Sequence, residues 1–282
     1  MWNWFSYLKP QTKELLESLD LIQANEAIIA TGIKPWDLDS IVERVMLACD
    51  LWLLDDLKAD KILVEQEYDL YSKGILDLIL IGTPEGKCGI VDWKTTGNLK
   101  RPNFIEEIKS DFQSSLYLAH GGDWLEKEYG VRPAYIEYRV LDENMEYRSF
   151  KVEAKVSDRE DANTQLMAIG ASFEGLLEDE VWPRNRPRAC FIGSKAGPTC
   201  PFYRDCMDMT MPRGVVNPDP AVTLDSLVPR SKSSMKSFLE CPERFRRTKI
   251  LGGTTPSSDA ILAGEAFHSG MESLYKQALA LK

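Results

Sequence analysis

The spacing of apolar residues changes along the chain from a helical period to a strand period. Residues 1–60 read as helices, and apolar positions recur at helical spacing over 41–57. A strand is predicted over 62–70, and two further apolar runs lie on either side of a Thr-Pro-Glu-Gly turn at 83–86. Two apolar runs around such a turn are typical of a β-hairpin.

The second half of the chain predicts a mixture of helices, strands and irregular segments. In order, we expect a helix over 103–125 with a break at Gly121-Gly122, paired strands over 134–141 and 147–154, a helix over 158–179, a loop over 183–199, a Pro-rich linker over 212–231, and two helices over 232–282.

The hairpin carries charged residues at positions that suit metal chemistry. Successive strand side chains alternate faces, so Asp92 and Lys94 point the same way and Trp93 points the opposite way. The hairpin can bring Asp77 near that pair. Two carboxylates can hold a hard divalent cation, and an ammonium beside them can orient a water or offset developing charge. The alternative is a solvated strand face with an ordinary Asp/Lys pair.

The bulk composition is that of a folded protein. The chain has 282 residues, of which 44% are hydrophobic and 28% are charged, enough for one large domain or two small ones. No basic segment followed by an apolar one opens the sequence, and no apolar run approaches the ~18 residues of a membrane span. We therefore expect no membrane partner and a cytoplasmic location.

The charge is distributed unevenly. The net charge of −10 argues mildly against a nucleic-acid partner. Residues 230–249, however, contain seven Lys or Arg against two Glu, an excess of +5. Such a segment suits phosphate binding, and a solvated helix face is the alternative.

The six cysteines fall into two groups. Cys49 and Cys88 lie in apolar stretches and are expected in the core. Four thiolates remain, which suit zinc or an iron–sulfur cluster. The paired C-x2-C knuckles of zinc ribbons are missing, so zinc ranks second, and free thiols are the alternative. These four cysteines are Cys190, Cys200, Cys206 and Cys241.

Taken together, these motifs resemble the PD-(D/E)XK nuclease superfamily, in the RecB-like branch that includes Cas-four exonucleases and many phage exonucleases. The resemblance covers most of 61–120 and 186–275. The matching motifs are Gly74-x-x-Asp77, Asp92-x-Lys94, Gln113-x-x-x-Tyr117, Gly264-x-x-x-His268, the opening helix SKSSMKSFLECPERFRR and the closing segment CPFYRDC.

The resemblance implies an α/β, restriction-endonuclease-like core with a mixed central sheet flanked by helices, plus added helices and a cysteine-ligated cluster region. It implies that Asp77, Asp92 and His268 ligate Mg²⁺ or Mn²⁺, with the Trp93 carbonyl as a further ligand. Lys94 would position the water or stabilise the charge of the transition state.

Three further residues receive roles from the same resemblance. Glu65 is an additional acidic ligand or base, with a surface-strand role as the alternative. Gln113 and Tyr117 would hold the substrate backbone or order the site, since i, i+4 spacing places them on one helix face. Simple packing of that helix on the sheet is the alternative for these two.

The resemblance also implies a structural [4Fe-4S] cluster held by Cys190, Cys200, Cys206 and Cys241. The family usually carries C-x2-C-x5-C near its end, and here Gly197 occupies the place of the first of those cysteines. Cys190 would then act from a longer loop. Zinc is the second choice.

The order of the motifs departs from that of the family. In relatives the Cys-Pro helix and the histidine helix precede the hairpin, whereas here they come last. Joining Lys282 to Met1 would restore the usual order, which chains tolerate when their termini lie close together. A rival interpretation is that 226–282 begins a second, truncated nuclease domain.

On the first interpretation, residues 1–282 form one circularly permuted nuclease domain. Its parts would be a helical segment (1–60), a catalytic core (61–180), a cysteine segment (181–211), a linker (212–231) and the final helices (232–282).

The expected function is therefore a metal-dependent DNA nuclease, and within that class an exonuclease. DNA, single-stranded or at duplex ends, would be the substrate, and a helicase, a recombinase or another nucleic-acid-processing protein would be the partner. The alternatives are a catalytically inactive DNA-binding or assembly subunit of the same fold and a zinc-stabilised interaction module.

Overall fold

The computed structural model describes residues 8–179, 229–250 and 259–282, and these form two compact units. The larger unit contains the described parts of 1–70, 74–159 and 257–282. The smaller unit contains 71–73 and the described parts of 160–256. Cys190, Cys200 and Cys206, the loop at 183–199 and nearly all of the predicted linker lie outside the described residues.

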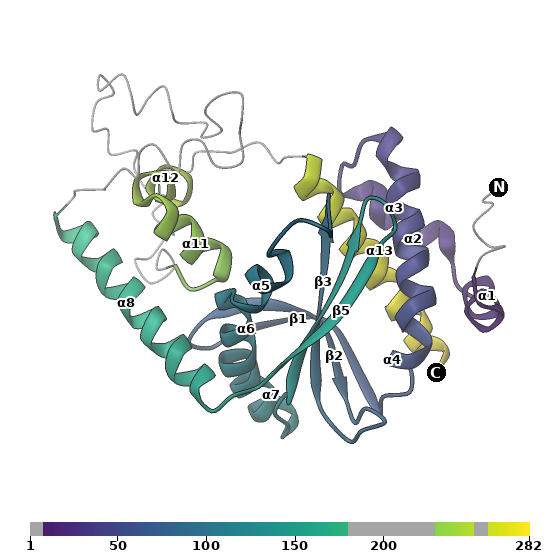
Figure 1. The fold of residues 1–282 in the computed structure, drawn as a ribbon, viewed down its shortest axis with the longest axis horizontal. Coiled ribbons are helices and arrows are strands. Elements are labelled where there is room, and N and C mark those ends of the chain that lie inside the picture. The colour runs from purple at the N-terminus through teal and green to yellow at the C-terminus, as the bar shows by residue number, and fades with distance from the viewer. Residues whose placement is uncertain (1–7, 180–228, 251–258) are drawn as a thin grey trace. The chain divides into compact units, whose positions relative to one another are not determined.

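The larger unit is built on a five-stranded sheet in the order β1-β2-β3-β4-β5 (Figure 1). β2 pairs antiparallel with β3, β3 pairs parallel with β4, and β4 pairs antiparallel with β5, so the sheet is mixed. The predicted hairpin and the predicted pair of strands are both confirmed. The strands are β1 (Lys61–Asp69), β2 (Lys73–Ile81), β3 (Gly89–Thr96), β4 (Tyr135–Asp142) and β5 (Tyr147–Glu153).

One face of the sheet is covered by helices from both ends of the chain. Leu78, Leu80, Val91 and Trp93 share a continuous apolar core with these helices. In Figure 1 the yellow C-terminal helix α13 lies beside the purple N-terminal α2 and α3. The helices of this layer are α1 (Pro10–Glu17), α2 (Leu21–Ala30), α3 (Pro35–Ala48), the π-turn η2 (Cys49–Leu53), α4 (Leu54–Asp56) and α13 (Asp259–Leu281).

Local sequence explains where these helices begin. Pro10 and Pro35 lie in the first turns of α1 and α3, where a missing N–H costs nothing. The carboxylate of Asp20 caps α2 by accepting from the backbone N–H groups of Ile22 and Gln23. The prediction of helices before residue 60 is confirmed for the described part of that segment.

The other side of the sheet carries a second group of helices, where one prediction needs correction. The helix expected over 103–125 is interrupted at Ser110–Asp111, where Asp111 caps a new helix by accepting from the backbone N–H of Gln113. The glycines predicted to break it lie within a continuous helical run. This group comprises α5 (Phe104–Lys109), α6 (Phe112–Leu116), the π-turn η3 (Tyr117–Gly121) and α7 (Gly122–Tyr129).

Packing explains why one of the two glycines occurs inside a helical run. A Cβ on Gly122 would lie 3.2 Å from the ring of Pro133, so glycine there reflects the close approach of the helix to its neighbour. A Cβ on Gly121 would lie 3.5 Å from the side chain of Leu76 in β2, which is an ordinary contact distance. The packing of the run against β2 and Pro133 overrides the usual helix-breaking tendency of both glycines.

The smaller unit has its own aromatic core. Phe173, Phe238 and Phe245 pack edge-to-face with ring centroids 5.6–6.0 Å apart. Ser231 caps α11 through a capping box with Ser234, as the serines in this segment predict. Its helices are α8 (Ser157–Asp179), α11 (Lys232–Glu240), α12 (Pro242–Phe245) and the π-turn η5 (Arg246–Ile250).

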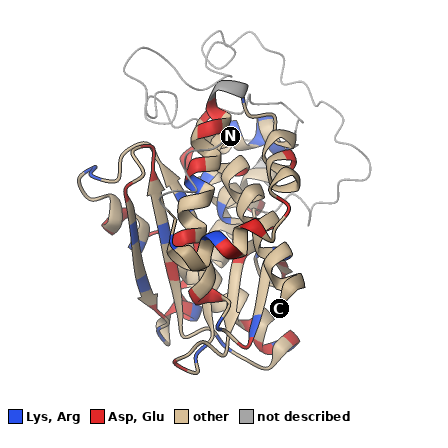
Figure 2. Cartoon of the chain, turned by 90° about the vertical axis from the view of Figure 1, so that its right-hand side faces the viewer, with Lys and Arg blue, Asp and Glu red and all other residues tan. Residues whose placement is uncertain are grey.

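The basic excess over 230–249 is partly neutralised within this unit. Arg244 pairs with Glu240, while Arg246 and Arg247 both pair with Glu243 at 2.7 Å. Along the described helices and strands, acidic and basic positions are interspersed (Figure 2). Both interpretations of the basic segment therefore stay predictions. None of the helices in the described part of the chain is long and apolar enough to cross a membrane.

Candidate metal centre

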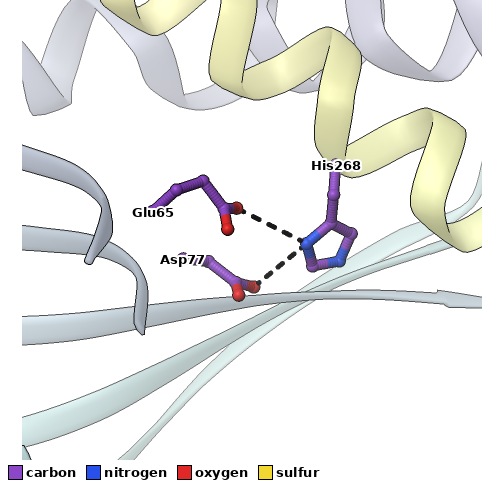
Figure 3. A group of neighbouring side chains, drawn as sticks. All are labelled: Glu65, Asp77 and His268. Carbon is purple, nitrogen blue, oxygen red and sulfur yellow. Dashed lines mark ion pairs between the residues drawn. The ribbon is translucent and has the colours of Figure 1, made fainter. Parts of the chain in front are cut away.

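Three potential metal ligands from separate elements converge in the larger unit. They are Glu65 on β1, Asp77 on β2 and His268 on α13, and one ligand atom of each lies within 4.8 Å of the other two. Nδ1 of His268 is 3.6 Å from Oδ2 of Asp77 and 3.9 Å from Oε1 of Glu65 (Figure 3). Only the fold brings them together, because His268 lies in the last helix of the chain, far in sequence from the two acids.

The backbone at Glu65 is in an unusual conformation for a strand. Its φ is 47°, in the left-handed region that non-glycine residues seldom adopt. Oε1 of this side chain is buried and has no hydrogen-bond donor among the described residues. A strained backbone that delivers an unsatisfied carboxylate oxygen to a cluster of ligands is characteristic of a functional site.

The backbone N–H and carbonyl of Trp93 orient the other two ligands. Its N–H donates to Oδ2 of Asp77 at 2.8 Å. Its carbonyl oxygen is 3.0 Å from Nε2 of His268. A carbonyl can only accept, so the ring carries its proton on Nε2, and Nδ1 is the nitrogen that faces the two acids. The indole ring of Trp93 is buried and packs against His268 at 6.1 Å between centroids.

The electrostatics of this group favour retention of a proton. Burial, together with the nearby Asp92 and Glu65 carboxylates, outweighs the opposing charges of His268 and Lys94 and raises the pKa of Asp77 to about 7. Burial disfavours a charged imidazole, but the Asp77 and Glu65 carboxylates outweigh it and raise the pKa of His268 to about 9. Without a metal ion, a proton on Nδ1 therefore takes the position between the acids.

Asp92 is held beside this group by partners on both of its oxygens. Oδ1 accepts from Nε2 of Gln113 at 2.7 Å, and Oδ2 forms an ion pair with the ammonium of Lys94. Burial works against the charge on Lys94, but Asp92 and Asp77 raise its pKa above the ordinary value. Lys94 is therefore a permanent cation at neutral pH and not a general base.

The Lys94 ammonium also lies over an aromatic ring. Nζ is 6.0 Å from the ring centroid of Tyr138, the register partner of Asp92 on β4. The hydroxyl of Tyr138 is 2.8 Å from Oγ of Ser114 on α6. Tyr138 is fully buried, so its ring is a fixed surface against which the Asp92–Lys94 pair packs.

The glycine of the first motif has a steric explanation. A Cβ on Gly74 would lie 2.9 Å from Cε1 of Tyr68 and 3.2 Å from Cε1 of Tyr117. The two tyrosine rings meet edge-to-face at 6.1 Å. Tyr117 in turn hydrogen bonds with Gln113. Gly74 thus leaves room for the rings of Tyr68 and Tyr117. Tyr117 in turn supports Gln113.

A buried charge network anchors the helix that carries His268. The guanidinium of Arg139 donates to Asp56, with Nη2 to Oδ1 at 2.7 Å. The hydroxyl of Tyr275, two turns after His268 on α13, donates to Oδ2 of Asp56 at 2.6 Å. The ring of Tyr275 lies 5.3 Å from that of Trp93. These contacts tie α13 to α4, β3 and β4 and thereby set the position of His268.

Comparison with known proteins assigns the family. A model of the PD-(D/E)XK nuclease superfamily matches residues 9–206. The chain belongs to this superfamily. The matched region contains Glu65, Asp77, Asp92 and Lys94, whereas His268 lies beyond it. No curated protein sequence matches the chain.

The α/β, restriction-endonuclease-like fold predicted from the sequence is confirmed by the mixed sheet and its flanking helices. Members of the superfamily usually use Mg²⁺ or Mn²⁺, and the residues present fit such an ion. Two carboxylates and one imidazole supply hard and borderline ligands. Oε1 of Glu65 is buried, forms no hydrogen bond among the described residues and faces the imidazole at 3.9 Å, and this is the observation that a cation would account for.

The fold brings together most of the predicted site, with Glu65 in a more prominent place than expected. Glu65 joins Asp77 and His268 in the group of three, while both oxygens of Asp92 are engaged by Gln113 and Lys94. The carbonyl of Trp93 accepts from His268, and its role as a ligand stays a prediction. The same holds for direct ligation by Asp92.

Several residues that support the site were not predicted from the sequence. Tyr68, Ser114 and Tyr138 support Gln113 and Lys94, and Asp56, Arg139 and Tyr275 anchor α13. Only Arg139 carried a usable signal, because a charged residue inside a largely buried strand needs a partner.

The cysteines of the chain lie only in part among the described residues. Cys49 and Cys88 are buried, and burial raises the pKa of Cys88 to about 11, which agrees with the core roles expected for both. Cys241 is a buried free thiol at the start of α12. The other three predicted cluster ligands lie outside the described residues, so the cluster stays a prediction.

Proposed function

We propose that this protein is a metal-dependent deoxyribonuclease of the RecB-like branch that hydrolyses phosphodiester bonds. One observation carries the proposal. In a chain of the PD-(D/E)XK nuclease superfamily, Glu65, Asp77 and His268 converge on one point beside the Asp92–Lys94 ion pair. Acids, an imidazole and a permanent cation in one place form a site suited to a divalent metal and a phosphate.

Each residue of the site has a distinct role in this proposal. Glu65, Asp77 and His268 would hold Mg²⁺ or Mn²⁺, which when bound lowers the pKa of water and polarises the phosphate. A water oxygen would attack phosphorus and give up one proton, the P–O ester bond would break, and the leaving oxygen would take up one proton. Lys94 stays protonated and offsets the negative charge that develops on the phosphoryl oxygens.

The supporting residues keep Lys94 and Asp92 ready for this step. Gln113 holds one oxygen of Asp92, so the other oxygen stays directed at the ammonium. The buried ring of Tyr138, over which the Lys94 ammonium lies, limits the motion of that ammonium. Such fixed charges need little reorganisation during reaction, which is the main source of electrostatic catalysis.

We further propose that the chain is one circularly permuted nuclease domain. Support comes from His268, which completes the metal group from the C-terminal helix, and from the packing of α13 against α2 and α3. The rival, a second truncated domain, would give His268 no reason to meet Asp77. A rearranged chain that starts at residue 229 and joins 282 to 1 should keep the same Mn²⁺ affinity. Loss of folding in that chain would favour the rival.

A structural iron–sulfur cluster is also part of the proposal. Its support is the set of four cysteines, of which Cys241 is buried and free. Anaerobically purified protein should absorb near ~400 nm and contain iron and acid-labile sulfide. Protein that contains only zinc would contradict the cluster.

Cleavage of labelled DNA tests the enzymatic claim. Wild-type protein with Mn²⁺ should degrade single-stranded or end-containing duplex DNA, and a closed circular substrate should be resistant if the protein is an exonuclease. Lys94→Ala should reduce the rate by two orders of magnitude or more, in line with roughly 10²–10³ for the loss of one group that stabilises transition-state charge.

A matched control separates catalysis from folding. Lys87→Ala removes an exposed lysine from the turn of the same hairpin and should leave the rate unchanged. DNA binding without cleavage by wild type would favour the inactive assembly subunit. Equal cleavage by wild type and Lys94→Ala would point to a contaminating nuclease.

A further inference from the structure

Two glycines on α13 differ in their surroundings, although they lie six residues apart. A Cβ on Gly270 would lie 2.9 Å from Cγ2 of Val45 and 3.0 Å from Cδ1 of Ile28. Close packing of α13 on α2 and α3 therefore requires glycine there. A Cβ on Gly264 would meet only Oγ1 of Thr95 among the described residues, at an ordinary contact distance of 3.5 Å.

The fold alone does not account for Gly264. Glycine inside a helix costs about 1 kcal/mol relative to alanine, and the described surroundings have room for an alanine. Gly264 lies one turn before His268, so both occupy the same face of α13. The position that lacks a side chain is therefore next to the metal group.

Thr95 lies opposite this gap on β3, next to Lys94. Its hydroxyl forms no hydrogen bond within the described part of the chain, and its side chain is only partly buried. The side chain of His268, on the same face of α13 as Gly264, is partly exposed, at 30%. A free hydroxyl and a missing side chain thus mark the open edge of the metal group.

We infer that Gly264 leaves a notch through which the substrate phosphate reaches the metal group, and that the Thr95 hydroxyl binds that phosphate. This inference rests on the proposed function, since it names where the nucleic-acid backbone enters. A hydroxyl donates well to a phosphate oxygen, and bonds to charged acceptors are stronger than neutral ones. A side chain at position 264 would occupy the space directly above that hydroxyl.

Substitutions at 264, 270 and 95 test the notch by four measurements. These are thermal stability, Mn²⁺ affinity by calorimetry, kcat and KM for a labelled oligonucleotide, and binding of the same oligonucleotide in Ca²⁺ by anisotropy. Gly264→Leu should keep the melting temperature and the Mn²⁺ affinity of wild type, and its KM and its Kd in Ca²⁺ should rise about tenfold or more. Gly264→Ala should show a smaller rise.

The other variants serve as matched controls. Gly270→Ala should lower the melting temperature without raising KM, because its Cβ meets Val45 and Ile28 and not the substrate. Thr95→Val should raise KM about tenfold. Thr95→Ser keeps the hydroxyl and should recover most of the affinity that Thr95→Val loses.

Three outcomes would overturn the notch. One is a KM and a Kd for Gly264→Leu within twofold of wild type. Another is a loss of Mn²⁺ affinity or folding in Gly264→Leu, which would make the glycine a packing residue. The third is equal behaviour of Thr95→Val and Thr95→Ser. If wild type cleaves no DNA, the proposed function fails, and oligonucleotide binding in Ca²⁺ still decides whether Gly264 and Thr95 meet a phosphate.

Discussion

The Gln113 side chain donates to a buried oxygen of Asp92 at 2.7 Å, and this bond leaves the second oxygen of Asp92 for Lys94. The helix α6 and the strand β3 are therefore connected by a side-chain amide at the site of the proposed chemistry. Asp92 is 1% exposed, so water cannot replace the amide if it is removed.

Gln113→Leu should therefore lower both stability and activity. The loss of a partner from a buried carboxylate costs about 1–3 kcal/mol or more, and Asp92 would turn toward other donors such as Lys94. We expect an unfolding free energy lower by about that amount in urea titration. Gln23→Leu, an exposed glutamine on α2, is the control and should change neither. A fully active Gln113→Leu protein would show that the amide only packs.

Tyr275→Phe tests the network that anchors α13. The change removes the hydroxyl that donates to Asp56 while Arg139 still pairs with that carboxylate. The unfolding free energy should fall by about 1.5–3 kcal/mol, as for hydrogen bonds to charged groups. Tyr147→Phe removes a hydroxyl from a tyrosine that is 51% exposed. The unfolding free energy of this variant should lie within ~0.5 kcal/mol of that of wild type. Equal effects of the two changes would mean that Tyr275 contributes only its ring.

Gly74→Ala tests the steric account of the first motif. Its Cβ would come within 2.9 Å of the Tyr68 ring, so Tyr68 and Tyr117 must shift, and overpacking of this kind costs about 1–3 kcal/mol. Gly170→Ala in α8 has nothing within 4 Å of the new Cβ and should be neutral or slightly stabilising. Thermal melts of both variants check the prediction, and a Gly74→Ala protein as stable as Gly170→Ala would contradict it.

The affinity for a metal ion should increase as pH rises. Without metal, His268 keeps a proton up to a pKa of about 9, and Asp77 keeps one up to a pKa of about 7. A cation at Nδ1 must displace these protons, so binding tightens as pH rises. Calorimetry with Mn²⁺ should show affinity rising about tenfold per pH unit between 7 and 9 and more steeply below 7.

His268→Ala provides the comparison for that titration. The variant should bind Mn²⁺ more weakly and should show a smaller total rise in affinity with pH, because the imidazole proton is gone and only the carboxyl proton of Asp77, whose pKa the His268 charge no longer lowers, is left to displace. An equal total rise in wild type and His268→Ala would place the titrating group elsewhere.

The sequence predicted the sheet and the hairpin because their signals are local. Alternating apolar runs around a Thr-Pro-Glu-Gly turn define β2 and β3, and the spacing of Asp92 and Lys94 places both on one face. The break at Asp111 and the continuous run through Gly121 were missed. Whether a glycine interrupts a helix depends on what lies against it, and Leu76 and Pro133 are distant in sequence.

The sequence predicted which residues form the candidate site better than it predicted how they are arranged. Asp77 and His268 followed from motifs, and Glu65 was included only as an additional acid. Its place in the metal group depends on a φ of 47°, which no pattern of residue types reveals. The Asp56–Arg139–Tyr275 network joins residues 83 and 219 positions from Asp56, and only the folded chain shows it.

The most direct test of the account is the position of a bound Mn²⁺ ion, measured by anomalous X-ray scattering from crystals grown with MnCl₂. We predict a peak within about 2.5 Å of a carboxylate oxygen of Glu65, a carboxylate oxygen of Asp77 and a ring nitrogen of His268. A peak bound elsewhere, or none near these three side chains at saturating Mn²⁺, would contradict the claim that they hold the catalytic metal.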